Sequence, residues 1–457
     1  MNDSWQYMLD FVFISLLIFV AAVLKSRLSF LRQWIVPTAM LAGFLGILLG
    51  PDLLGFLPFD YDRLGNLVYH LMGIGFIALS LKSREVTNSP GIVNSGLIIV
   101  STYLIQGIVG LGLFIVLVAL FYPDMFQGLG LLLPLGFGQG PGQAYSIGSS
   151  WEALGVKEGG NLGLAVAGIG FLWATIIGVV LMNVLSRRKS YQQRSYNEQD
   201  EEEQRSAAIA QHKEAPLADA IDRLTYQVVL IGIVYLMTYL TLVAAERLLT
   251  PLGSFGETFA QLLIGFHFII GSLYAMLVRS ILTKLEKRGF RTEHTIDHYM
   301  MQRVSGFAFD YMITASIAAI SIHALKEYAI PILLLTTLGG AVTIWYMLWI
   351  VPRAFPKEKL PNVLGFYGML TGTISTGLAL VKGVDPKFRS NTADNLVVGS
   401  ASAILFGFPM LLVLNIPVIG YRENKPEMYV YTLLILIAYF GLLFGALLLR
   451  TRKQEKK

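Results

Sequence analysis

Long apolar stretches separated by short polar segments dominate the chain. A helix needs about 20 consecutive, mainly apolar residues to cross the hydrocarbon core of a bilayer. Eleven stretches come close to this length, and we expect each to form a transmembrane helix. They cover roughly residues 5–24, 35–56, 66–81, 97–121, 161–185, 226–245, 260–282, 304–325, 330–351, 396–419 and 428–449.

Two further apolar stretches, residues 128–150 and 363–384, are rich in glycine and small polar residues. The first contains PLGFGQGPGQ and the second contains GFYGMLTGTISTG. In a continuous helix each glycine would cost about 1 kcal/mol and an interior proline about 3 kcal/mol. Irregular backbone at membrane depth is tolerated where protein buries it or where it lines a cavity. We therefore predict that each stretch is a re-entrant hairpin with an unwound tip.

The distribution of basic residues favours this interpretation. Loops on the cytoplasmic side of a membrane carry an excess of lysine and arginine. With two hairpins, 29 of the 35 basic residues fall on one face and six on the other. If both stretches crossed fully, the numbers would be 16 and 19, against the rule. The hairpin topology predicts a plasma-membrane protein with an external N-terminus, a cytoplasmic linker over residues 186–224 and a cytoplasmic C-terminus.

The composition agrees with a polytopic α-helical membrane protein. Hydrophobic residues make up 54% of the chain, charged residues only 14%, and there is no cysteine. These values exclude a disordered chain, a disulfide-built secreted domain and a thiol-ligated metal site. The net charge of +5 lies in short loops, so it predicts no nucleic-acid partner. The N-terminus lacks a basic segment and a cleavage site, so we expect no signal peptide.

The order of elements repeats along the chain. Residues 1–185 contain four spans, a hairpin and one span, and residues 225–426 contain the same order. The first repeat starts outside and the second inside, so the two are expected to be inverted. Residues 427–457 add a further transmembrane helix and a basic tail.

Two hairpins that enter from opposite faces would bring their tips together near the bilayer midplane. Half-helix N-termini there favour a carboxylate, and free carbonyls suit Na⁺, so the pattern predicts a secondary transporter without an organic cofactor. We expect the substrate to contact Gly140, Pro141, Gly142, Gln143, Tyr145, Ser146, Gly372, Thr373, Ser375, Thr376 and Arg389. We expect the cation to contact Gln139, Asn161, Asp310, Thr371, Asp394 and Asn395.

Several candidates have a second interpretation. Asp310 lies about 9 Å into its predicted span, where a carboxylate serves either cation coupling or a structural pair. Arg389 either pairs with a substrate carboxylate or is one more topology charge. Asn161 and Asn395 occupy helix starts, where N-capping is the alternative role. We interpret His267, in the middle of a span, as a hydrogen-bonded structural residue rather than a proton relay.

Two inverted five-span repeats, each with a glycine-rich hairpin before its last span, resemble the sodium/glutamate symporter family. Gly140-Pro141-Gly142-Gln143-Ala144 is similar to that family's Gly-His-Gly-Thr-Ala stretch, with Pro141 at the His position and Gln143 at the Thr position. The segment from Gly372 to Thr376 resembles the family's small-residue, Thr-containing segment. The resemblance implies Na⁺-coupled uptake of glutamate or a related anion, a homodimer, and hairpins that move with a rigid transport unit in an elevator-like cycle.

Other functions stay open at this point. A carrier for dicarboxylates or a cation/proton antiporter of similar build would give Asp310 and His267 larger roles. A channel is less compatible with inverted hairpins, which favour alternating access. A membrane-embedded enzyme lacks support, because there is no HExxH motif and neither Ser146 nor Ser375 has an evident histidine partner.

Overall fold

The computed structural model describes residues 3–28, 36–82, 90–188, 191, 223–288, 296–386 and 389–455. Most of the predicted linker, residues 186–224, lies outside them. The described residues form helices and no strand. Eight of these helices are long and apolar enough to cross a membrane: Trp5–Arg27, Tyr61–Leu81, Gly91–Leu120, Gly159–Ser186, Arg223–Leu252, His267–Glu286, Leu325–Ala354 and Glu427–Arg452. The prediction of an all-helical, multi-span protein is confirmed at this level.

The helices of the first half follow the predicted order. They are α1 (Asp3–Arg27), α3 (Thr38–Leu49), α4 (Tyr61–Leu81) and α5 (Pro90–Leu120), then the 3-10 helix η1 (Gln127–Leu131), the π-helix η2 (Pro134–Gln139) and α6 (Pro141–Glu152). A long helix follows, formed by α7 (Gly159–Leu172), the π-helical turn η3 (Trp173–Ile177) and α8 (Gly178–Ser186). We call residues 127–152 hairpin 1.

The helices of the second half are α10 (Arg223–Leu249), the 3-10 turn η6 (Thr250–Leu252), α11 (Ser254–Gly265), α12 (His267–Lys287), α13 (His298–Ala318) and α14 (Ile322–Ala354). After them come α15 (Lys359–Leu370), α16 (Ile374–Val384), α17 (Thr392–Val413), α18 (Asn415–Arg422) and α19 (Glu427–Glu455). We call residues 359–384 hairpin 2.

Four expected spans differ from the helices observed. The stretch 35–56 is helical only in the 12-residue α3, because Pro37 precedes it and Gly50-Pro51 ends it. The stretch 260–282 is broken at Phe266 into α11 and α12, and 396–419 is broken at Leu414 into α17 and α18. The stretch 304–325 is divided between two helices, because α13 ends at Ala318 and the 33-residue α14 begins at Ile322.

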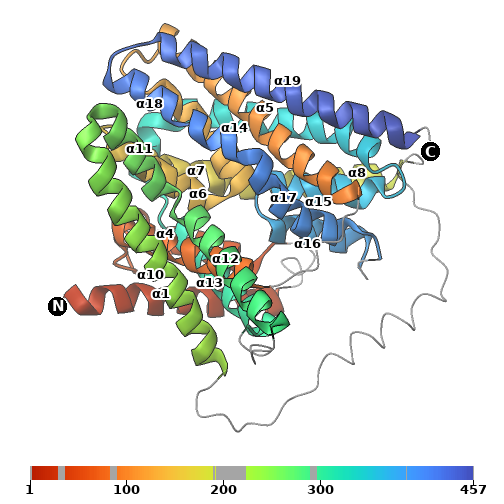
Figure 1. The fold of residues 1–457 in the computed structure, drawn as a ribbon, viewed down its shortest axis with the longest axis horizontal. Helices are drawn as coiled ribbons and strands as arrows, with labels where there is room; N and C mark the ends of the chain where they lie inside the picture. Colours follow the sequence, from red (N-terminus) through yellow and green to blue (C-terminus); the bar gives the residue numbers. More distant parts are fainter. Residues whose placement is uncertain are drawn as a thin grey trace.

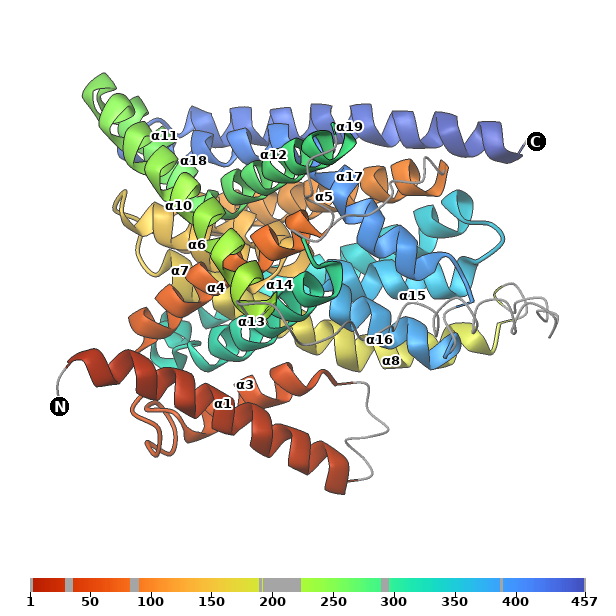
Figure 2. The same cartoon turned by 60° about the horizontal axis from the view of Figure 1, so that its bottom comes forward.

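The exposed surface of the outer helices is apolar. Leu236 and Leu240 of α10 are 55% and 57% exposed, and Leu434 and Leu442 of α19 are 56% and 65% exposed. Figure 2 shows α19 along one side of the molecule and α1 along the opposite side. Apolar side chains in such positions are stable against lipid, which agrees with a protein embedded in a bilayer.

Helices α5 and α14 pack against each other in antiparallel directions. Tyr346 Oη of α14 donates to Ser101 Oγ of α5 over 2.8 Å, and Gln106 Nε2 donates to Thr343 Oγ1 over 2.9 Å. As the residue number rises along α5, it falls along α14. Hairpin 1 follows the end of α5 and hairpin 2 follows the end of α14, so the hairpins start at opposite ends of this pair. Figure 1 shows α6 and α7 near α18, and α15 and α16 toward the other end.

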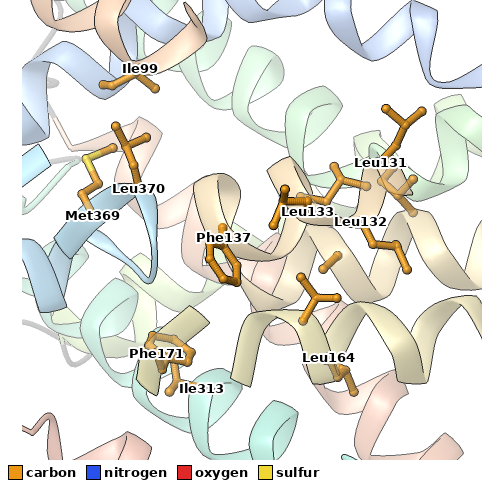
Figure 3. Close-up of a cluster of buried hydrophobic side chains, with 14 of the residues drawn as sticks. Ile99, Leu131, Leu132, Leu133, Phe137, Leu164, Phe171, Ile313, Met369 and Leu370 are labelled. Atoms are coloured by element: carbon orange, nitrogen blue, oxygen red, sulfur yellow. The ribbon is translucent and has the colours of Figure 1, made fainter. Parts of the chain in front are cut away.

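Hairpin 1 starts and ends at the same place. The rings of Phe126 and Trp151 lie 5.7 Å apart, although 25 positions separate them. Its first arm packs tightly on α5, where a Cβ added at Gly110 would lie only 2.0 Å from the carbonyl oxygen of Gly130. Figure 3 shows its apolar side chains, Leu131 to Phe137, beside Leu164 and Phe171 of α7.

Hairpin 2 is a tight pair of short helices. A Cβ added at Gly368 of α15 would lie 3.0 Å from the Cα of Gly377 in α16, so the two backbones are in contact. Small residues permit this approach, as they do at other helix contacts in membranes. The base is closed by Asn395 Nδ2 of α17, which donates to Asn362 Oδ1 of α15 over 3.0 Å.

We predict that Gly110→Ala destabilises the protein, because its methyl group would collide with the first arm of hairpin 1. Gly112 is the matched control, since a Cβ there meets nothing within 4 Å. Gly112→Ala should be neutral or stabilising, because alanine favours the helix by about 1 kcal/mol. Thermal unfolding of both variants in detergent tests this. Equal melting temperatures for the two variants would contradict the packing.

Candidate functional site

The tips of the two hairpins meet inside the protein. The first tip is Gly140, whose φ of +104° favours glycine. A Cβ added there would lie 3.7 Å from Cγ2 of Thr373 and 3.9 Å from the carbonyl oxygen of Gly372. Thr371, Gly372 and Thr373 form the second tip, between α15 and α16. Two segments more than 200 positions apart therefore present irregular backbone to each other.

Each tip joins the end of one helix to the beginning of the next. Helix α6 begins at Pro141 without a side-chain cap, directly after Gly140. Helix α16 begins at Ile374 with a capping box between Thr373 and Thr376, and the buried Oγ1 atom of Thr373 makes no further hydrogen bond among the described residues. Because N–H groups in the first turn of a helix have no partner within it, both helix starts favour an anion between them.

The second tip is held by its own threonines. Thr376 Oγ1 donates to the carbonyl oxygen of Gly368 over 2.6 Å and accepts from the N–H of Thr373 over 2.9 Å. Thr371 Oγ1 donates to the carbonyl oxygen of Tyr367 over 2.8 Å. Both hydroxyls therefore shape the backbone of hairpin 2, which leaves the Thr373 hydroxyl available at the tip.

Polar groups at the tips differ in exposure. Gln143 is 5% exposed and makes no hydrogen bond to another described residue. Gly140 and Gly142 are buried, while Gln139 and Thr373 are half-buried and Ser375 is exposed. The tip region thus combines buried polar groups with exposed ones, an arrangement that suits a small polar ligand.

Gln106 of α5 is a tip-side residue that the sequence analysis missed. It is fully buried, its Nε2 donates to the carbonyl oxygen of Leu370 over 3.0 Å, and its Oε1 has no partner among the described residues. A Cβ added at Gly138 of hairpin 1 would lie 3.0 Å from this Oε1. A glutamine in the middle of an apolar span was the signal that could have revealed it.

Three candidates in or after hairpin 1 point away from the tips. The ring of Tyr145 lies against Gly65 of α4 and Gly160 of α7. Ser146 Oγ donates to the carbonyl oxygen of Gly265 over 2.6 Å, at the break between α11 and α12. Asn161 Nδ2 donates to Glu158 Oε2 over 2.8 Å in the first turn of α7.

The candidates that follow hairpin 2 lie at its base. The N–H of Arg389 donates to Asp385 Oδ1 over 2.9 Å, just beyond the end of α16. Asp394 is exposed in the first turn of α17, and Asn395 bonds to Asn362 at the start of α15. The structure does not bring these three residues to the tips, and their site roles stay predictions.

Asp310 lies on an exposed face of α13, two residues before Met312. Its side chain has no hydrogen-bond or ion-pair partner among the described residues. Met312 itself approaches hairpin 1, since a Cβ added at Gly142 would lie 2.9 Å from its sulfur atom. Asp310 therefore lies on the helix whose Met312 approaches α6, but Asp310 itself is not part of the contact between the tips.

His267 is a packed residue at the α11–α12 break. Its Nε2 lies 3.0 Å from the carbonyl oxygen of Tyr69, and its ring stacks on the Tyr69 ring at 3.6 Å. Tyr69 Oη in turn donates to the carbonyl oxygen of Ile264 over 2.9 Å. Together with Ser146, Tyr69 satisfies carbonyl groups that the broken helix leaves without partners.

The described residues contain no group of three His, Cys, Asp or Glu side chains that could hold a metal ion. The polar groups at the tips themselves are backbone carbonyls, hydroxyls and amides, which are ligand types that suit Na⁺ better than a transition metal.

A family model described as sodium/glutamate symporter matches residues 5–390 of the chain. The matched part includes both hairpins and stops before α17. No curated protein and no solved structure matches the chain.

We predict that Thr376→Val lowers the melting temperature and that Thr376→Ser does not. The valine variant keeps the shape of the side chain but removes the hydroxyl that joins Thr373 to Gly368. Unfolding should become easier by about 1–3 kcal/mol, because buried groups lose their partner. Thermal unfolding in detergent measures this, and a valine variant as stable as the wild type would rule out the structural role.

Proposed function

The chain belongs to the sodium/glutamate symporter family, whose model covers residues 5–390, and we propose that the two contacting hairpin tips bind the substrate and its coupling ions. Membership of this family implies sodium-coupled glutamate transport by a multi-pass membrane protein. The family is one of transporters and not of enzymes.

The observation that carries the proposed site is the contact between Gly140 and the segment from Gly372 to Thr373. Two helix starts converge there, the uncapped start of α6 and the start of α16, and they provide N–H groups for the carboxylates of glutamate. Thr373 adds a buried hydroxyl oxygen and Gln143 adds an amide on a side chain that is 5% exposed, and a bound ligand would contact both. No basic side chain is needed at the tips for this mode of binding.

The two halves of the chain are proposed to be inverted repeats, residues 1–185 and 225–426. The antiparallel packing of α5 and α14 supports this arrangement, because the two helices hold equivalent places before hairpins 1 and 2. Hairpins that start from opposite faces allow the tip region to be reached alternately from each side. We propose that the hairpins move together with the helices on which they pack, in an elevator-like cycle of a homodimer.

Ion coupling follows from the charge that crosses the membrane. Moving one charge through 100 mV is worth about 2.3 kcal/mol. Glutamate carries one net negative charge, so an inside-negative potential opposes its entry. One Na⁺ cancels this charge, and a second makes the potential drive uptake. A site that binds the anion together with at least one Na⁺ is therefore required for accumulation.

The proposed orientation places the linker and the C-terminus in the cytoplasm. At one end of the helix bundle, Lys25 donates to the carbonyl of Val36, Arg279 donates to that of Lys82, and Arg450 donates to Asn94. This end also carries the start of the linker. The positive-inside rule assigns it to the cytoplasm.

We predict that the purified protein, reconstituted in liposomes, takes up labelled glutamate when an inward Na⁺ gradient is imposed. Replacing Na⁺ with choline should abolish uptake, and excess citrate should not compete with glutamate. Gly142→Leu and Gly372→Leu should eliminate uptake, because a Cβ at either position approaches a neighbouring atom to 2.6 Å. Gly441→Leu on α19 is the control, since its Cβ meets nothing within 4 Å.

Several results would contradict this assignment. Glutamate uptake that does not depend on Na⁺ would contradict sodium coupling. Citrate uptake without glutamate uptake would favour the alternative of a dicarboxylate carrier. Normal uptake by both tip variants would place the substrate elsewhere in the protein.

We predict that reporters fused within the linker and after Lys457 both read as cytoplasmic in cells. A reporter fused before Met1 should read as external. A fusion that places the linker and the C-terminus on different faces would contradict the inverted arrangement of the two halves.

A further inference from the structure

Gln106 lies beside the ends of the first arms of both hairpins, η2 in hairpin 1 and α15 in hairpin 2. On one side, its amide nitrogen is bonded to the carbonyl of Leu370, the last residue of α15. On the other side, its carbonyl oxygen faces Gly138, in the last turn of η2. The final carbonyls of a helix have no partner within it and carry the negative end of the helix dipole. Gln106 therefore lies between two regions that favour a cation.

The orientation of the Gln106 amide is fixed by its partners. The carbonyl oxygen of Leu370 only accepts hydrogen bonds, and the Thr343 hydroxyl donates its hydrogen to the carbonyl of Gly339 over 2.7 Å. Both partners need a donor, so the atom that faces them is Nε2 and the atom that faces Gly138 is Oε1. The unpaired oxygen is a result of this geometry.

The unpaired oxygen is free to accept a ligand. Gln106 is fully buried in the middle of α5, and its Oε1 has no hydrogen-bond partner among the described residues. A buried acceptor without a partner is unfavourable. Gly138 lies on this side, in the last turn of η2, where the final carbonyls have no partner within the helix. A small dehydrated cation is the kind of ligand that such a group of oxygens accepts.

On the basis of the proposed function, we propose that Gln106 Oε1 is a ligand of the coupling Na⁺, in a site completed by carbonyl oxygens at the ends of η2 and α15. The site lies on the carbonyl side of the hairpin tips, whereas the substrate carboxylates face the N–H groups that begin α6 and α16. A cation there stabilises both arms at their negative ends and so favours the tip arrangement that binds the anion. Coupling between the ion and glutamate follows from this shared support.

The test compares Gln106→Leu with Thr343→Val. Both variants remove one side of the hydrogen bond between α5 and α14, but only Gln106→Leu removes the oxygen that faces Gly138. Binding of radioactive Na⁺ to the purified, full-length protein is measured without glutamate, and the Na⁺ dependence of glutamate uptake is measured in liposomes. Gln106→Glu is a third variant, which keeps the size of the side chain and an oxygen at this position.

Gln106→Leu should raise the Na⁺ concentration for half-maximal binding about 10-fold or more. The ion would lose one oxygen ligand, and such a contact with a charged group is about as strong as a hydrogen bond. Thr343→Val should keep Na⁺ binding near the wild type, whereas Gln106→Glu, which places a negative charge beside the ion, should bind Na⁺ more tightly. Size-exclusion chromatography checks that each variant is folded. If Gln106→Leu does not fold, stronger Na⁺ binding by Gln106→Glu supports the proposal, and equal or weaker binding overturns it.

Two outcomes would overturn the proposal while leaving the proposed function intact. Equal effects of Gln106→Leu and Thr343→Val on Na⁺ binding would show a structural link only. Weaker glutamate binding by Gln106→Leu with unchanged Na⁺ binding would assign the oxygen to the substrate ammonium group. If the wild type does not transport glutamate, the direct Na⁺ binding of these variants still decides the role of Gln106.

Discussion

Every peptide group in the hydrocarbon core must have a hydrogen-bond partner inside the protein, and this requirement governs the whole architecture. Continuous helices meet it by themselves, so most of the chain is helical. Where a helix breaks, other groups of the protein must provide the missing hydrogen-bond partners. At the α11–α12 break, Tyr69 and Ser146 donate to the free carbonyls of Ile264 and Gly265. At the hairpin tips, such completion is only partial, because Thr373 Oγ1 and Gln106 Oε1 are left without partners.

The α11–α12 break and the tips differ in their surroundings. The break is packed with side chains, and His267, whose Nδ1 is also unpaired among the described residues, stacks on Tyr69 there. At the tips, the unpaired atoms lie beside the backbone that we propose to bind the solute and its ion. Glycine allows the φ of +104° at the first tip, which lies beside the side chain of Thr373 and the carbonyl of Gly372, so backbone groups supply much of the polar character of the tips. The fold therefore brings the ends of four short helices, η2, α6, α15 and α16, close together.

Much of this arrangement could be predicted from the sequence, because glycine-rich segments indicate where the backbone departs from a regular helix. Glycine and small polar residues located the two irregular stretches, and the chain does break inside them, at Gly140 and at residues 371–373. Hydropathy alone did not reveal the break at Phe266 or the short α3, since apolar residues continue through both. Candidate side chains were less predictable: Tyr145, Ser146 and Arg389 have suitable chemistry, but helical phase and hairpin direction place them away from the tips. Gln106 was missed because its partners, Thr343 and Leu370, are more than 230 positions away.

The length of α14 has a consequence for the surrounding lipid. Its 33 residues extend about 50 Å, well beyond the hydrocarbon layer of about 30 Å. The helix must tilt or project from the bilayer, and its tilt depends on how thick the membrane is. Because α14 contacts Leu133 of hairpin 1 and leads directly into hairpin 2, acyl-chain length acts on the positions of both tips. Membrane thickness therefore acts on the region that we propose as the solute site.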